Sequence, residues 1–172
     1  MDVPNAEPWD SWDVPADQPP TKEGIANQVQ EAASGFASVL EKASENLLVQ
    51  PGAVGDWSAR ECLAHCVIWC EYCEEVLRRS LHGTFRAEDF YYGEEIEDPR
   101  AYNAVTVEAE SDVAVEELLS RLAKSSADVA ALLRALPREE FESRRRYRQV
   151  VAGTITDHLA EHGSQLQSFL GR

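Results

Sequence analysis

Two histidines near the C-terminal end of this 172-residue chain lie one helical turn apart. His158 and His162 have an i, i+4 spacing, which places both side chains on one face of a helix. The same face carries the apolar residues Ile155, Leu159 and Leu166. Both imidazoles are therefore expected to point toward the core, where an unpaired polar ring is costly and a metal ion is one common way to satisfy it.

His65 lies far upstream, in a second strongly helical stretch. By itself, a histidine near the edge of an apolar helix face is more often a core or boundary residue than a ligand. Together with the pair, it offers three neutral imidazoles from two facing helices, which could cap one face of a divalent ion. Other positions of the ion would stay open, as in catalytic sites, so that it could activate water or bind a thiolate or a substrate oxygen.

The segment from His158 to His162 also fits the H-x-x-E-H pattern of inverted zinc peptidases. Those enzymes are large and take a carboxylate ligand from well downstream, whereas only ten residues follow His162, so we interpret the match as a coincidence. Glu161 flanks the ligand face and is a candidate base or ligand-orienting group, with Asp157 as a candidate partner of a ligand. The alternative for both carboxylates is a solvated acidic face.

Four amphipathic stretches must position these residues. The apolar period predicts helices over residues 21–48, 58–81, 112–136 and 148–170. Neither an alternating strand pattern nor an internal repeat is present, so we predict an all-α four-helix bundle over residues 21–172. A long crossover, residues 82–110, joins the second and third helices, and connections of this length are often functional lids.

Local signals indicate where the elements begin and end. Ser58, followed three residues later by Glu61, forms a capping box at the start of the second helix. Residues 1–20 hold five of the eight prolines and are predicted to be an extended arm. Helices are expected to stop at the other three prolines, Pro51, Pro99 and Pro137.

All four cysteines fall on one stripe of the predicted second helix. They are Cys62, Cys66, Cys70 and Cys73. Ligands spaced along one straight helix cannot all surround a single ion, and the geometry and a reducing compartment disfavour disulfides between them. We interpret these cysteines as small buried hydrophobic side chains.

The charge balance restricts the class of partner. A net charge of −15 and a pI near 4.6 argue against a general nucleic-acid binder and against docking on anionic membranes. The run RRRYR at 144–148 is basic although the chain as a whole is acidic. These arginines either reach an anionic ligand or pair with acidic side chains on the surface. Neither a secretory signal nor an apolar run of about 18 residues is present, so we expect a cytoplasmic protein.

Several motifs together resemble a known family. The segment 55–65 reads GDWSARECLAH and resembles the opening of the second helix in the DinB/YfiT-like superfamily. The His158–His162 pair, followed by Gln165, is similar to the closing ligand pair of that superfamily, and segment 101–103 (AYN) also fits. Segment 136–141 (LPREEF) is similar to the branch that contains colibactin self-protection proteins. The resemblance covers roughly residues 22–170.

This resemblance implies an up-down-down-up bundle, often dimeric, in which His65, His158 and His162 hold a divalent metal, with Zn²⁺ or Ni²⁺ expected. Some relatives are thiol-dependent transferases or isomerases, maleylpyruvate isomerases among them, that use mycothiol, bacillithiol or glutathione. Others protect a producer cell by opening or hydrolysing a reactive natural product.

We therefore predict a metal-dependent enzyme that acts on a small electrophilic molecule by thiol-dependent transfer or detoxification, with Glu161 as the candidate catalytic carboxylate. The first alternative is a self-resistance protein that hydrolyses or sequesters a toxic natural product. The second is a metal-binding stress protein of the same fold without enzymatic activity. The predicted partners are a small-molecule substrate and a second copy of the chain.

Overall fold

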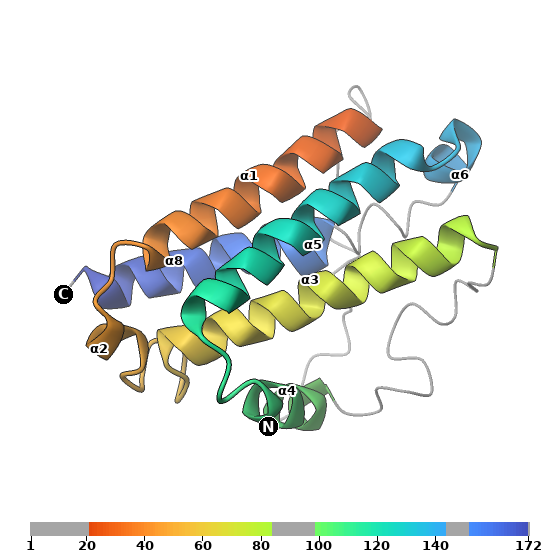
Figure 1. Ribbon diagram of the computed structural model, residues 1–172. Helices are drawn as coiled ribbons and strands as arrows, with labels where there is room; N and C mark the ends of the chain where they lie inside the picture. Colours follow the sequence, from red (N-terminus) through yellow and green to blue (C-terminus); the bar gives the residue numbers. More distant parts are fainter. Residues whose placement is uncertain (1–20, 84–98, 144–151, 172) are drawn as a thin grey trace, which may run out of the picture.

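The computed structural model describes residues 21–83, 99–143 and 152–171, most of which are helical (Figure 1). The elements are α1 (Lys22–Leu40), α2 (Glu45–Leu48), α3 (Ala59–Leu81), α4 (Pro99–Ala109), α5 (Val115–Ala135), α6 (Arg138–Ser143), the π-helix η2 (Ala152–Asp157) and α8 (His158–Leu170). In these three ranges, an isolated bridge between Val54 and Trp57 is the only β-type pairing. The predicted all-α fold class is confirmed.

Helices α1, α3, α5 and α8 form the bundle (Figure 1). Both α1 and α3 pack against α5 and α8. Lys22 Nζ, at the start of α1, donates to the carbonyl oxygens of Arg134 and Leu136 at the end of α5, so these two helices are antiparallel. Since α3 runs in the direction of α5, and α8 in the direction of α1, the order is the predicted up-down-down-up (Figure 1).

The core is apolar, and all four bundle helices contribute to it. Replacing one of its buried leucines by alanine is expected to cost about 2–5 kcal/mol. The four cysteines of α3 are buried too, and all four carry free thiols. The largest fully buried side chains are those of Leu40, Leu63, Leu77, Leu118, Leu122, Leu133, Leu136, Ile155, Leu166, Val29, Val67 and Val129.

The predicted capping box at the start of α3 is confirmed. The backbone N–H of Ser58 donates to Glu61 Oε2 at 2.7 Å, and the backbone N–H of Glu61 donates to Ser58 Oγ at 3.2 Å. The Ser58 hydroxyl also donates to Glu61 Oε2, at 2.6 Å. These bonds satisfy N–H groups that have no partner within the helix, and they fix where α3 begins. The position of His65, within the first two turns, follows from that start.

A Ser58→Ala variant is expected to lower the free energy of unfolding by about 1–2 kcal/mol, because it removes the side-chain half of the capping box. Urea unfolding at a fixed metal concentration measures this change. Ser44→Ala is the matched control, since Ser44 caps α2 without a side-chain hydrogen bond, and we expect a change within about 0.5 kcal/mol there. Equal losses in the two variants would contradict the assigned role of Ser58.

The prediction of one continuous helix over 21–48 is wrong. Helix α1 ends at Leu40, residues 41–44 form a turn, and α2 begins after Ser44, whose ψ of 151° is extended. Serine favours this extended N-cap conformation over a helix interior. The apolar period continues through Ala43 and Leu47, so the pattern alone did not reveal the break.

The predicted crossover 82–110 contains a further helix, α4. Pro99 does not only stop a helix; it is the first residue of α4, where its missing N–H costs no helical hydrogen bond. The indole N–H of Trp69 donates to Asn103 Oδ1 at 2.9 Å, which attaches α4 to α3. The next helix, α5, starts at Val115 rather than at residue 112.

Three predicted features lie outside the described residues: the arm 1–20, the basic run 144–148 and the part of the crossover at 84–98. Among the residues that are described, no helix is long and apolar enough to cross a membrane. The assignment of residues 21–172 to one domain stays a prediction.

Candidate metal centre

Three imidazoles meet between α3 and α8. His65 comes from α3, and His158 and His162 come from the first turns of α8. The Nε2 atom of His158 lies 2.9 Å from Nε2 of His65 and 2.8 Å from Nε2 of His162. One ligand nitrogen from each residue therefore lies within 4.8 Å of the others.

The local structure explains how the three rings meet. The i, i+4 spacing on α8 places His158 and His162 side by side, with their ring centroids 4.5 Å apart and their planes tilted by 57°. His65 is buried on the face of α3 that packs against α8, with 5% of its surface exposed. The π-helix η2 leads directly into His158, and such wide turns occur often at functional sites.

The donor set fits a metal ion. A neutral imidazole carries one N–H, so a proton on His158 Nε2 can serve only one of its two close contacts. A protonated Nε2 has no lone pair with which to accept a second hydrogen bond, and an unprotonated Nε2 has only one, so the other close contact cannot also be a hydrogen bond. A cation among the three nitrogens removes this conflict, and three imidazoles are a common ligand set for zinc.

Gln165 orients the imidazole of His162. Its Oε1 lies 2.7 Å from Nδ1 of His162 and accepts the Nδ1–H hydrogen bond. With that proton on Nδ1, the lone pair of neutral His162 is on Nε2, which faces His158. Hydrogen bonds of this kind fix the tautomer and ring orientation of metal-binding histidines.

Aromatic side chains surround His65. The ring of Trp57 lies 4.9 Å from the imidazole and that of Trp69 lies 6.4 Å from it, centroid to centroid. Tyr102 of α4 packs edge-on against Trp69 at 5.8 Å, next to the bond between Trp69 and Asn103. Both indoles are partly exposed, so they offer apolar faces beside the three histidines.

The pKa values follow from this packing. Burial is the main cause that lowers the pKa of His65 to about 3, and the charges of His158 and His162 add to it. His65 is therefore neutral at physiological pH, the form that binds metals. Burial alone would lower the pKa of His162. The hydrogen bond to Cys62, the charge of Cys62 and the hydrogen bond to Gln165 act against burial, and the pKa is raised.

The predicted carboxylates are not part of this cluster. Glu161 is exposed on α8, beside His162, where its charge contributes to the raised pKa of that histidine. Asp157 is also exposed, and partial burial raises its pKa. The roles assigned to both residues stay predictions.

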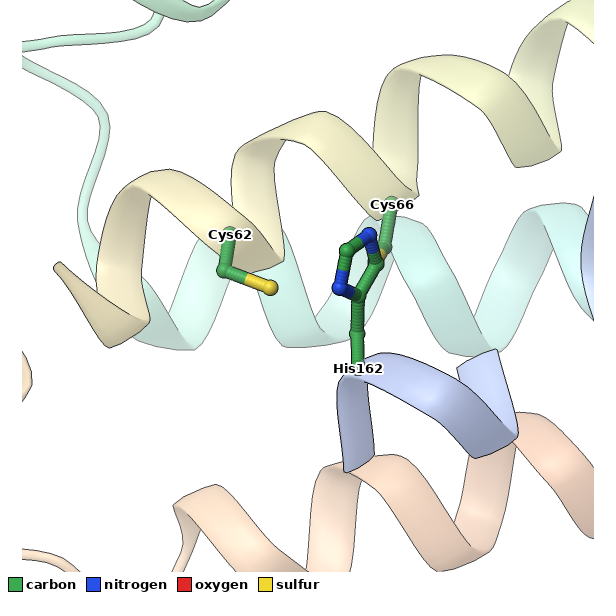
Figure 2. Close-up of side chains that lie close together, drawn as sticks. All are labelled: Cys62, Cys66 and His162. Carbon is green, nitrogen blue, oxygen red and sulfur yellow. The ribbon is translucent and has the colours of Figure 1, made fainter. Parts of the chain in front are cut away.

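Sequence reasoning missed a second group of potential ligands. Cys62, Cys66 and His162 each place a ligand atom within 4.8 Å of the others (Figure 2). The hydrogen bond from Cys66 is the main cause that lowers the pKa of Cys62 to about 6. Burial acts in the opposite direction on Cys62, and His162 lowers its pKa further. Burial is also the main cause that raises the pKa of Cys66. The i, i+4 spacing of the two cysteines was the available signal, but the facing histidine could not be read from α3 alone.

Comparison with known proteins agrees with this fold. The colibactin self-resistance protein ClbS, crystallised in complex with a dsDNA, matches with a TM-score of 0.76 at 15% identity, over 90% of this chain and 97% of that one. Comparison with curated proteins finds no match. The model of the DinB superfamily matches residues 28–166, a range that contains all three clustered histidines. This chain therefore belongs to the DinB superfamily.

Proposed function

We propose that this protein is a metal-dependent enzyme that acts on a small electrophilic molecule, by thiol-dependent transfer or by detoxification. The observation that carries the proposal is the convergence of three imidazole Nε2 atoms from two helices, next to partly exposed indoles. Three protein ligands leave room for a reactant, as catalytic sites require.

His65, His158 and His162 would hold the divalent ion, which we propose to be Zn²⁺ or Ni²⁺. When bound, such an ion supplies Lewis acidity that lowers the pKa of water or of a thiol. The chain itself supplies orientation: the bundle fixes the spacing of the rings, and Gln165 holds the His162 tautomer. Trp57 beside His65 offers an apolar ring face, which favours an apolar reactant.

The nucleophile decides between transfer and hydrolysis, and mass spectrometry can identify it. Metal-loaded protein is incubated with a panel of small electrophiles, with and without mycothiol, bacillithiol or glutathione. An enzyme-dependent thiol adduct supports transfer, whereas addition of water without thiol supports detoxification by hydrolysis. Unchanged electrophiles across the panel would contradict the enzymatic proposal, and tight binding of one of them would then indicate a binding or stress protein.

Self-resistance against a toxic natural product is the second candidate, and the fold match to ClbS favours it. In that case the substrate is an electrophilic metabolite, and expression should protect a sensitive host from it. ClbS was crystallised with dsDNA, whereas we propose a small molecule as the partner here. A net charge of −15 opposes duplex binding, because such binding is driven by basic residues that displace counterions.

Glu161 is our candidate for the catalytic base. It is exposed on the same helix as two proposed ligands, from where it could accept a proton from the attacking water or thiol. A Glu161→Gln variant is expected to lose roughly 100-fold in turnover and to keep its metal content. Glu116→Gln, at an exposed position of α5, is the control. Unchanged turnover in the Glu161 variant would contradict the role as a base and would indicate that Glu161 is an ordinary solvated surface residue.

The hydrogen bond from His162 to Gln165 predicts an effect on metal affinity. A Gln165→Ala variant is expected to bind Zn²⁺ about 10–100-fold more weakly, because the His162 ring loses its orienting acceptor. Competition with a chromophoric chelator measures this change. Gln167→Ala, at an exposed position two residues further along the same helix, should leave the affinity unchanged. Equal affinities for wild type and the Gln165 variant would contradict the role of this bond.

A further inference from the structure

Two cysteines of α3 lie beside the three-histidine cluster but outside it. Cys62 and Cys66 are one helical turn apart, with 0% and 2% of their surfaces exposed. Figure 2 shows the Cys62 side chain directed toward the imidazole of His162, which reaches α3 from α8. The ligand atoms of these three residues all lie within 4.8 Å of one another.

These separations suit one ion. Sulfur–zinc bonds are about 2.3 Å long, so two sulfurs on opposite sides of an ion are about 4.6 Å apart, and smaller angles bring them closer. Two thiolates on one helix cannot enclose an ion alone. The third ligand approaches from α8, since His162 faces both cysteines across the helix interface.

We propose that Cys62, Cys66 and His162 form a second metal site, selective for thiophilic cations of the Zn²⁺, Cd²⁺ and Cu⁺ class. Sulfur ligands select such ions, whereas the three imidazoles accept a wider range of first-row metals. Each thiol releases its proton as it binds. The two sites share His162, which is partly exposed. A neutral imidazole has one lone pair, so His162 serves one of the two sites at a time.

Cobalt and cadmium titrations of the reduced, metal-stripped full chain test this proposal. Thiolate ligation gives sulfur-to-metal charge-transfer absorption in the ultraviolet, which imidazole ligation does not give. We expect this absorption in the wild type and its loss in Cys62→Ala and Cys66→Ala. Cys73→Ala is the matched control, because Cys73 is equally buried on the same helix but outside the group, and it should keep the absorption.

A His65→Ala variant separates this site from the proposed catalytic one. It removes a ligand of the three-histidine set only, so the sulfur-to-metal absorption should persist while binding to the histidines weakens. His162→Ala should weaken both. Cadmium NMR of the wild type gives a result that does not depend on any variant folding: the expected spectrum shows a cadmium ion with two sulfur ligands. A cadmium-loaded wild type without sulfur ligation, or full charge-transfer absorption in the Cys62→Ala, Cys66→Ala double variant, would overturn the proposal.

Discussion

A His158→Ala variant is expected to lose both its metal and its activity. Nε2 of His158 lies within 3 Å of Nε2 of both other histidines, so it is the central donor of the set. Removing a direct ligand should weaken metal binding by more than the roughly 10–100-fold that follows loss of an outer hydrogen-bond partner. Elemental analysis of the purified protein, together with turnover of the electrophile identified by mass spectrometry, measures both effects.

The same variant should abolish stabilisation by metal. A ligand present at about 100 times its dissociation constant stabilises a folded protein by about 2.7 kcal/mol, and most of that gain should disappear. His82→Ala is the matched control, because His82 is the remaining histidine and is exposed after the end of α3. Full metal content and full activity in the His158 variant would refute the proposed function.

Much of the fold could be predicted because its signals are local. Ser58 and Glu61 lie three residues apart, so the start of α3 was readable without any tertiary information. The spacing of His158 and His162 predicted that their rings would lie next to each other on one face of α8, and their centroids are 4.5 Å apart. The contact of this pair with His65 depends on how α3 and α8 pack in the bundle. The spacing of the residues could not predict that packing, whereas the family resemblance did.

The remaining features depend on packing between distant segments. The interruption after Leu40 leaves the apolar period intact, so only the extended conformation of Ser44 reveals it. Helix α4 is held to the bundle by the bond between Trp69 and Asn103, a contact between residues on different helices. Cys62 and Cys66 looked like core residues for the same reason: their polar neighbour is on α8, in a part of the sequence nearly a hundred residues away.

The metal-free protein is expected to lose stability as the pH falls from about 6.5 toward 3, because His65 is buried in its neutral form. In this window the imidazole of the unfolded chain binds a proton that the folded chain does not, so the free energy of unfolding decreases with falling pH. One such group changes it by about 1.4 kcal/mol per pH unit. The effect of His162 is opposite in sign, since its raised pKa stabilises the folded state as the pH falls through that pKa toward 6.5.

Comparison with a His65→Leu variant isolates this contribution, because protonation of carboxylates at low pH affects both proteins alike. Urea unfolding in the presence of a chelator measures the free energy of unfolding of both proteins. The value for the wild type minus that for the variant should decrease with each pH unit below about 6.5. If the difference between wild type and His65→Leu is constant across this range, His65 titrates alike in both states, and its burial between Trp57 and the α8 histidines does not keep it neutral.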